Sequence, residues 1–134
     1  MVPVNYMAVV IAAVLAMVVG SVWYSKALFG KQWMRLTGVS PDSAKKGNMP
    51  MLYGTMFVGA LIESYVLAHF VHYAGAYDLI NGIKTGVWAW LGFVLTTSLA
   101  NSLFEGRPMK LLYINAGYAL VNLMIMGAVI SVVR

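Results

Sequence analysis

Four apolar stretches, each long enough to cross a lipid bilayer, constrain this chain more than any other feature of its sequence. They cover about residues 3–24, 51–72, 84–104 and 111–133, and a helix needs roughly 20 apolar residues to cross a hydrocarbon core about 30 Å thick. Hydrophobic residues make up 61% of the 134 residues and charged residues only 10%, which leaves too little polar surface for a domain surrounded by water. We therefore expect residues 1–134 to form a single integral membrane domain.

The four stretches are expected to be helices, including the first one. Membrane β-strands would alternate polar and apolar residues, whereas these stretches are continuously apolar, and a helix satisfies its own backbone hydrogen bonds in lipid. A cleaved signal peptide has a basic residue before its apolar core, but the first basic residue here is Lys26. The chain has no cysteine, which excludes disulfides and thiolate metal sites. The sequence thus predicts an all-α protein with four transmembrane helices.

The basic residues indicate how these helices are oriented. Loop 25–50 holds five Lys or Arg residues and loop 105–110 holds two, whereas the opposite side holds only Lys84 and Arg134. Because Lys and Arg are enriched in cytoplasmic loops, we expect both loops in the cytoplasm and both termini outside it. The net charge of +5 is then a consequence of topology, and without a recognition motif it does not predict nucleic-acid binding.

The loop between the first two spans is expected to contain a short amphipathic helix at the membrane interface. Within residues 25–38, four apolar side chains fall on one side of a helical wheel: Leu28, Phe29, Trp33 and Leu36. Lys31 and Arg35 lie beside them, and Gly38 is the expected stop. We expect Lys26, Lys31 and Arg35 to contact anionic lipid head groups, with simple interfacial anchoring as the alternative.

Small residues recur every four positions in three of the spans. The rows are Ala8, Ala12, Ala16 and Gly20; Ala60, Ser64 and Ala68; and Gly82 with Gly86. Such rows let helix backbones approach closely in membranes, so these faces should pack on another helix of the same chain or of a second copy. We therefore expect a homo-oligomer, while the partner helix of each row stays open.

A seven-residue similarity follows the first and third spans. Residues 28–34 read "LFGKQWM" and residues 103–109 read "LFEGRPM". This pattern favours a two-fold parallel repeat in which spans 1–2 and spans 3–4 are equivalent helix pairs. Chance similarity over so short a segment is the alternative.

Two longer segments resemble a known family. "GSVWYSKALFGKQWMRLTG" (20–38) and "NSLFEGRPMKLLYINAGY" (101–118) are similar to the signature of the bacterial membrane family catalogued as domain of unknown function 1761. The resemblance covers nearly the full length and implies a small four-span protein of the bacterial cytoplasmic (inner) membrane. The family has no agreed activity, so the resemblance supplies no catalytic residues. It directs attention to a cytoplasmic-end cluster: Trp23, Tyr24, Ser25, Lys31, Trp33, Asn101, Glu105, Arg107 and Asn115.

Polar residues on the third and fourth spans predict that these helices turn their polar faces toward each other. Thr97, Asn101 and Glu105 are spaced by four and share one helix face, with Ser98 and Ser102 beside them. Asn115 and Asn122 are seven apart on the fourth span and also share a face. Because amides at membrane depth need partners, we expect the two faces to meet, either as structural hydrogen bonding or as a head-group or substrate site.

Glu63 is an acidic residue well inside a span, 13 residues beyond position 50 and hence about 20 Å into the membrane at about 1.5 Å per residue. An ionised carboxylate at that depth is costly unless it is paired, so Glu63 should face protein or water and be protonated or hydrogen-bonded. The candidate intramembrane polar site comprises Glu63, Ser64, Tyr118 and Asn122.

His69 and His72 lie near the outer end of the second span. A pair of histidines three apart supplies two metal ligands, but a site needs at least a third, so we do not expect a metal. An ordinary polar end of the span is one interpretation, and a proton route from Glu63 to the outer surface is the other.

Three function classes follow from these residues. We favour a non-catalytic membrane module that self-associates and binds lipid or another membrane protein. The alternative is an oligomeric transporter or proton-linked channel that uses Glu63. An enzyme is not expected, and no cofactor is expected, because the sequence shows no nucleophile–base pair, metal set or phosphate-binding loop.

Overall fold

A computed structural model describes residues 2–25, 27–38 and 49–133, and every regular element in these ranges is helical. In chain order they are α1 (Tyr6–Trp23), α2 (Gly30–Thr37), α4 (Met49–Tyr73), α5 (Leu79–Ala89), the π-helix η1 (Trp90–Leu95), α6 (Thr96–Glu105) and α7 (Met109–Val132). The elements α5, η1 and α6 run on continuously as one span. Four helices are therefore long and apolar enough to cross a membrane, which confirms the all-α, four-span prediction.

The third span begins five residues earlier than residue 84, where the apolar stretch was expected to start. Asp78 caps it: its Oδ2 accepts a hydrogen bond of 3.1 Å from the Asn81 backbone N–H, and its Oδ1 accepts one of 2.6 Å from the Asn81 side chain. A carboxylate at this position satisfies backbone donors that the helix leaves free. The apolar stretch expected from the sequence did not include this turn, because the polar residues Asn81 and Lys84 interrupt the apolar residues here.

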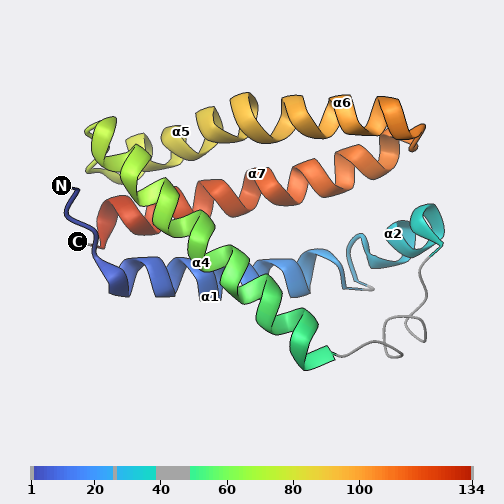
Figure 1. The fold of residues 1–134 in the computed structure, drawn as a ribbon, viewed down its shortest axis with the longest axis horizontal. Coiled ribbons are helices and arrows are strands. Elements are labelled where there is room, and N and C mark those ends of the chain that lie inside the picture. Colours follow the sequence, from blue (N-terminus) through green and yellow to red (C-terminus); the bar gives the residue numbers. More distant parts are fainter. Residues whose placement is uncertain (1, 26, 39–48, 134) are drawn as a thin grey trace.

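The arrangement of the four spans is asymmetric (Figure 1). The long third span lies along α7, while α4 slants across α1 and α7 on its way from Met49 toward α5. The two ends of the chain lie at the same end of the bundle, as an even number of spans requires. That this end faces outward remains a prediction from the basic residues.

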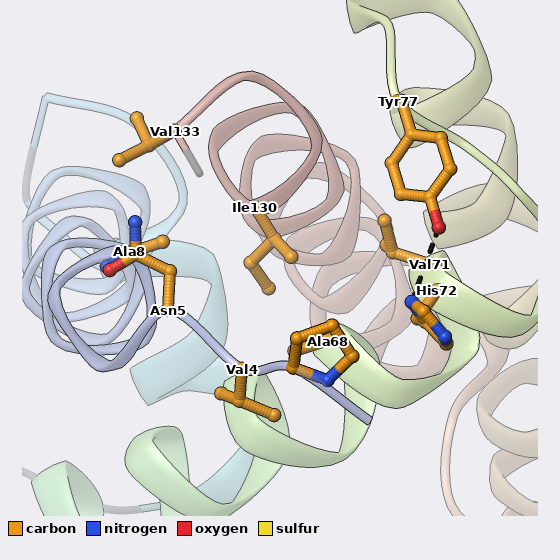
Figure 2. Close-up of a pocket in the computed structure, with 10 residues that line it drawn as sticks. Val4, Asn5, Ala8, Ala68, Val71, His72, Tyr77, Ile130 and Val133 are labelled. Carbon is orange, nitrogen blue, oxygen red and sulfur yellow. Dashed lines mark hydrogen bonds between the residues drawn. The ribbon is translucent and has the colours of Figure 1, made fainter. Parts of the chain in front are cut away.

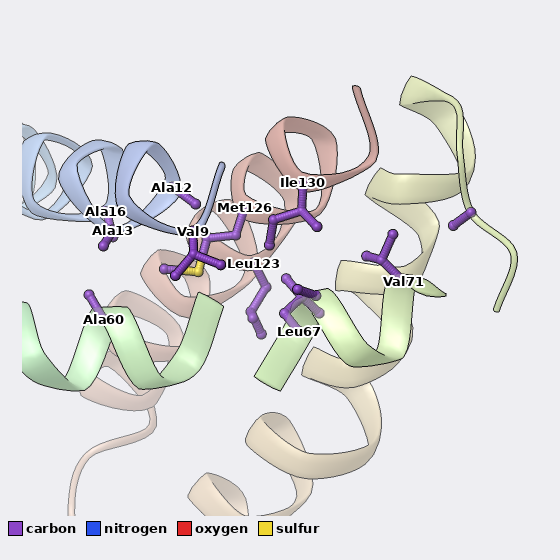
Figure 3. Close-up of a cluster of buried hydrophobic side chains, with 12 residues drawn as sticks. Val9, Ala12, Ala13, Ala16, Ala60, Leu67, Val71, Leu123, Met126 and Ile130 are labelled. Atoms are coloured by element: carbon purple, nitrogen blue, oxygen red, sulfur yellow. The ribbon is translucent and has the colours of Figure 1, made fainter. Parts of the chain in front are cut away.

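Two of the small-residue rows pack α1 against α4. Ala12, Ala13 and Ala16 are buried on α1, and Ala60 and Ala68 are buried on α4, in the core drawn in Figure 3. The backbones come close enough for the hydroxyl of Ser64, which is fully buried, to donate to the Val9 carbonyl at 3.0 Å. The prediction of close packing is confirmed, and its partner is a helix of the same chain.

The third row packs α5 against α7. A Cβ atom added at Gly82 would overlap the Gly127 carbonyl and the Ser131 hydroxyl, and one added at Gly86 would overlap the Leu123 carbonyl. Because most of these neighbours are backbone atoms, a rearrangement of side chains could not make room for the added Cβ atoms. Glycine is therefore required here by the distance between the two helices.

The helix expected within 25–38 is α2 (Gly30–Thr37), which is capped by Gly38 in the left-handed conformation, with φ of 75°. Its basic residues Lys31 and Arg35 are exposed, while Lys26 lies outside the described residues. The two similar segments differ in local structure: "LFG" at 28–30 leads into α2, whereas "LFEG" at 103–106 ends α6. The seven-residue similarity therefore marks no repeated local structure, and the repeat of helix pairs stays a prediction.

Candidate intramembrane polar site

Glu63 lies on α4 at a depth that lipid would occupy. It is the fifteenth residue of a 25-residue helix and so lies about 21 Å from the start of α4 at about 1.5 Å per residue. The residue is exposed in the single chain, whereas Ser64, the next residue, is fully buried against α1. Glu63 therefore stands at the edge of the α1–α4 contact with much of its surface uncovered.

Asn122 of α7 is the hydrogen-bond partner of Glu63. Its Nδ2 donates to Glu63 Oε1 at 3.3 Å, and the residue itself is only 4% exposed. The other side-chain atom, Asn122 Oδ1, is buried and has no hydrogen-bond partner among the described residues. A buried amide oxygen without a donor is uncommon, because its desolvation is not repaid by a bond.

The other two residues predicted for this site have their hydroxyls engaged elsewhere. The hydroxyl of Tyr118 donates to the Ala16 carbonyl at 3.1 Å, and that of Ser64 donates to the carbonyls of Val9 and Leu61. The bonds to Ala16 and Val9 run to the backbone of another helix and tie helices together, whereas the bond to Leu61 stays within α4. The site therefore reduces to the Glu63–Asn122 pair, with Tyr118 and Ser64 as structural neighbours.

The outward side of α4 carries a row that the sequence reasoning missed. Thr55, Gly59 and Glu63 are spaced by four and are all exposed, and a Cβ added at Gly59 would meet no heavy atom within 4 Å. We call this row, with the exposed residues Met56 and Val66 beside it, the α4 outer face. The spacing of four was visible in the sequence, but only the neighbouring row Ala60, Ser64 and Ala68 was predicted to be a packing face.

At the end of the bundle where α1 leads into α2, the structure brings together part of the cluster predicted for the cytoplasmic end. The hydroxyl of Tyr24 donates to Asn115 Oδ1 at 2.7 Å, and its ring makes an edge contact with Trp33 of α2, with centroids 5.9 Å apart. The indole of Trp23 donates to the Ile114 carbonyl at 3.0 Å. These contacts hold α2 and the end of α1 against α7.

The remaining members of that cluster lie elsewhere. Ser25 donates locally to the Val22 carbonyl at 2.6 Å, and Lys31 and Asn101 are exposed. Glu105 and Arg107 form an exposed ion pair at 2.6 Å across the turn between α6 and α7. A single nine-residue site is therefore not formed.

The prediction that Thr97, Asn101 and Glu105 face α7 is wrong, because all three are exposed. The π-helix η1 explains the error. Each of its turns takes an extra residue compared with an α-helix, so the face toward α7 moves along by one position. Ser102 is buried instead, and Ser98, four residues before it, is partly buried.

Threonine side chains follow this irregular stretch. Thr96 Oγ1 donates to the Gly92 carbonyl at 2.8 Å, and Thr97 Oγ1 donates to the Phe93 carbonyl at 2.6 Å. Ser and Thr hydroxyls commonly satisfy backbone carbonyls in membrane helices whose bonding is locally altered. Thr97, the first residue of the polar face predicted from the sequence, thus bonds to its own helix.

At the other end of the bundle, the two histidines have separate partners. His69 Nδ1 lies 2.9 Å from the Tyr65 carbonyl, and His72 Nδ1 lies 3.2 Å from the Tyr77 hydroxyl. His72 and Tyr77 line a mostly apolar pocket of about 490 Å³ between the start of the chain, α4 and α7, drawn in Figure 2. In the described part of the chain, no three potential metal-ligating side chains come together, and none of the hydrogen bonds found there joins Glu63 to a histidine, so a proton route through them stays a prediction.

Asp78 lies beyond this pocket, outside the spans. Hydrogen bonds from the side chain and backbone of Asn81 hold the pKa of the Asp78 carboxyl below its ordinary value. An ionised cap at the N-terminus of a helix is also favoured by the helix dipole. Asp78 therefore remains a charged cap at neutral pH.

The helices and the polar pair establish the general class of this protein. Four long apolar helices, judged by length and composition, make the chain a multi-pass membrane protein, and a carboxyl–amide pair lies within its spans. The chain belongs to the family described as "Protein of unknown function (DUF1761)", which matches residues 7–131 and so confirms the resemblance drawn from the two quoted segments. No curated protein and no solved structure matches it.

Proposed function

We propose that this protein is a self-associating membrane module in which the α4 outer face of one copy packs against a second copy. The observation that carries the proposal is the exposure of Glu63 near the middle of a membrane-spanning helix. Insertion scales place the cost of an acidic residue at the bilayer centre at about 2.5–3.5 kcal/mol. Covering that face with protein removes the carboxyl from lipid.

The shape of the α4 outer face supports a helix as the occupant. Thr55 and Gly59 are small and exposed, four residues apart, which lets a second backbone approach closely. The same chain supplies such helices, since its own contacts use this small-residue packing at Ser64 and Gly86. A second copy is therefore the partner we propose.

The proposal includes where the module lies and what surrounds it. We place it in a cytoplasmic membrane with both termini outside, because its basic loops then face the cytoplasm. The exposed Lys31 and Arg35 of α2 then contact anionic head groups at the interface. No reaction is assigned to the module, which acts by binding.

Cysteine cross-linking tests the self-association directly, because the natural chain has no cysteine. Single-cysteine variants Met56→Cys and Val66→Cys, at positions 48% and 45% exposed, should form disulfide-linked dimers in native membranes. Val14→Cys and Val18→Cys on α1 are matched controls, because these positions are 47% and 53% exposed. Equal cross-linking at all four positions, or cross-linking only on α1, would overturn the proposal.

A second candidate function is proton-linked transport through the oligomer, favoured by the contact between Glu63 and Asn122. Purified protein in liposomes distinguishes the two. A pH-driven flux that Glu63→Gln abolishes supports transport, whereas flux equal to that of empty liposomes, with cross-linking intact, supports the module.

A further inference from the structure

We infer that Glu63 carries its proton at neutral pH and that its O–H donates to Asn122 Oδ1, so that the two side chains form a carboxylic acid–carboxamide pair that binds one proton. The inference names the ligand of the second candidate function, the proton. It does not depend on self-association, because both groups belong to one chain.

The donors and acceptors of the two side chains lead to this assignment. Asn122 uses Nδ2 to donate to Glu63 Oε1, while its buried Oδ1 lacks a donor. An ionised carboxylate only accepts hydrogen bonds, whereas a protonated carboxyl has one O–H to donate. Protonating Glu63 therefore supplies a donor to Asn122 Oδ1. The acid and the amide are then joined by two hydrogen bonds, one from the carboxyl O–H to Oδ1 and one from Nδ2 to Oε1.

The charges around Glu63 favour the same state. On α1 there is no Asp, Glu, Lys, Arg or His, and the titratable group that α7 places near Glu63 is Tyr118, a neutral phenol whose hydroxyl donates to Ala16. On α5, Lys84 is exposed near the outer end. His69 and His72, on the same helix as Glu63, bond to Tyr65 and Tyr77.

These surroundings supply no cation to an ionised Glu63 from the described parts of the packed helices. Within a span, a carboxylate without a counter-charge is strongly disfavoured. Loss of the proton would also remove one of the two bonds to Asn122 and leave its Oδ1 without a partner again. The pair is therefore stable in its protonated form and weakened when the proton leaves.

Infrared spectroscopy of the full chain in lipid nanodiscs tests the inference, because the C=O stretch of a protonated carboxyl is separate from that of a carboxylate. The chain has only four acidic residues, Asp42, Glu63, Asp78 and Glu105. Asp78 is a charged cap and Glu105 is paired with Arg107 on the surface. We expect a protonated-carboxyl band at neutral pH that is lost in Glu63→Gln and kept in the matched control Glu105→Gln.

The pairing with Asn122 has its own readout. In Asn122→Leu the band should move to higher frequency, because the carboxyl loses its hydrogen bonds to the amide. A second route avoids any variant of Glu63: ¹³C-labelled glutamate in Glu105→Gln leaves one labelled carboxyl, and its band should shift with the isotope. An absent band at neutral pH, a band without the isotope shift, or an unmoved band in Asn122→Leu would each overturn the inference, whatever the cross-linking shows.

Discussion

The contact between α5 and α7 makes a strong prediction, because it depends on a missing side chain. A Cβ at Gly86 would lie 2.7 Å from the carbonyl carbon of Leu123 and 3.1 Å from the backbone nitrogen of Met124. Both atoms belong to the backbone of α7, so Gly86→Ala has to push the helices apart. Small-to-large changes in a packed core cost about 1–3 kcal/mol.

Two terms oppose each other in this variant. Alanine is the better helix former by about 1 kcal/mol, which offsets part of the steric cost. We expect a net loss of up to about 2 kcal/mol in the free energy of unfolding, which at its upper end is roughly a 30-fold change in the unfolding equilibrium. Reversible unfolding in mixed micelles, followed by the fluorescence of the four tryptophans of the chain, measures this loss.

Gly54→Ala is the matched control. Gly54 also lies on a span, but it is exposed, and a Cβ added there meets no heavy atom within 4 Å. It lies nine residues before Glu63 and so on the opposite side of α4. Only the propensity difference remains, so stability should be unchanged or raised by up to about 1 kcal/mol. If Gly86→Ala proved as stable as Gly54→Ala, the close backbone contact between α5 and α7 would be refuted.

Two further predictions concern the ends of the bundle. Tyr24→Phe removes the 2.7 Å bond to Asn115 and should lower the free energy of unfolding by about 1–2 kcal/mol. It should also loosen α2, which is measured as faster proteolysis after Lys31 or Arg35. Tyr53→Phe, at an exposed position, is the control, and equal proteolysis of the two variants would contradict a role of Tyr24 in holding α2. The cap at Asp78 should depend on pH: since its pKa is lowered in the folded chain, its contribution is complete above the ordinary Asp value of about 3.9 and is lost as the pH falls through the folded value. Amide exchange at Asn81, corrected for the intrinsic pH dependence, should therefore rise at acid pH and be insensitive to pH in Asp78→Ala.

Much of this fold was predictable because lipid imposes simple requirements. Continuous apolar stretches located the spans, and the spacing of Ala12, Ser64 and Gly86 identified faces that had to pack closely. The amphipathic pattern around Trp33 located α2. In each case the signal is local in sequence and follows from a helix repeat of 3.6 residues.

Other features could not be predicted because they depend on tertiary structure or on a departure from that repeat. The π-helix rotated Asn101 away from α7 and Ser102 toward it, and no residue in the stretch marks that departure. The depth of Glu63 in the membrane limited its partner to polar side chains at a similar depth, but which of them it contacts depends on how α4 crosses α7. The exposure of Gly59 likewise follows from that crossing.

The slant of α4 also connects this protein to the thickness of its membrane. A helix of 25 residues is about 37 Å long at about 1.5 Å per residue, longer than a hydrocarbon core of about 30 Å, and tilting accommodates the excess. The bond from Ser64 to Val9 fixes one point of α4 against α1, so a change of tilt has to turn the helix about that point. A thicker bilayer therefore favours a more upright α4, and Glu63, next to the pivot, would keep its depth while the two ends of the helix swing.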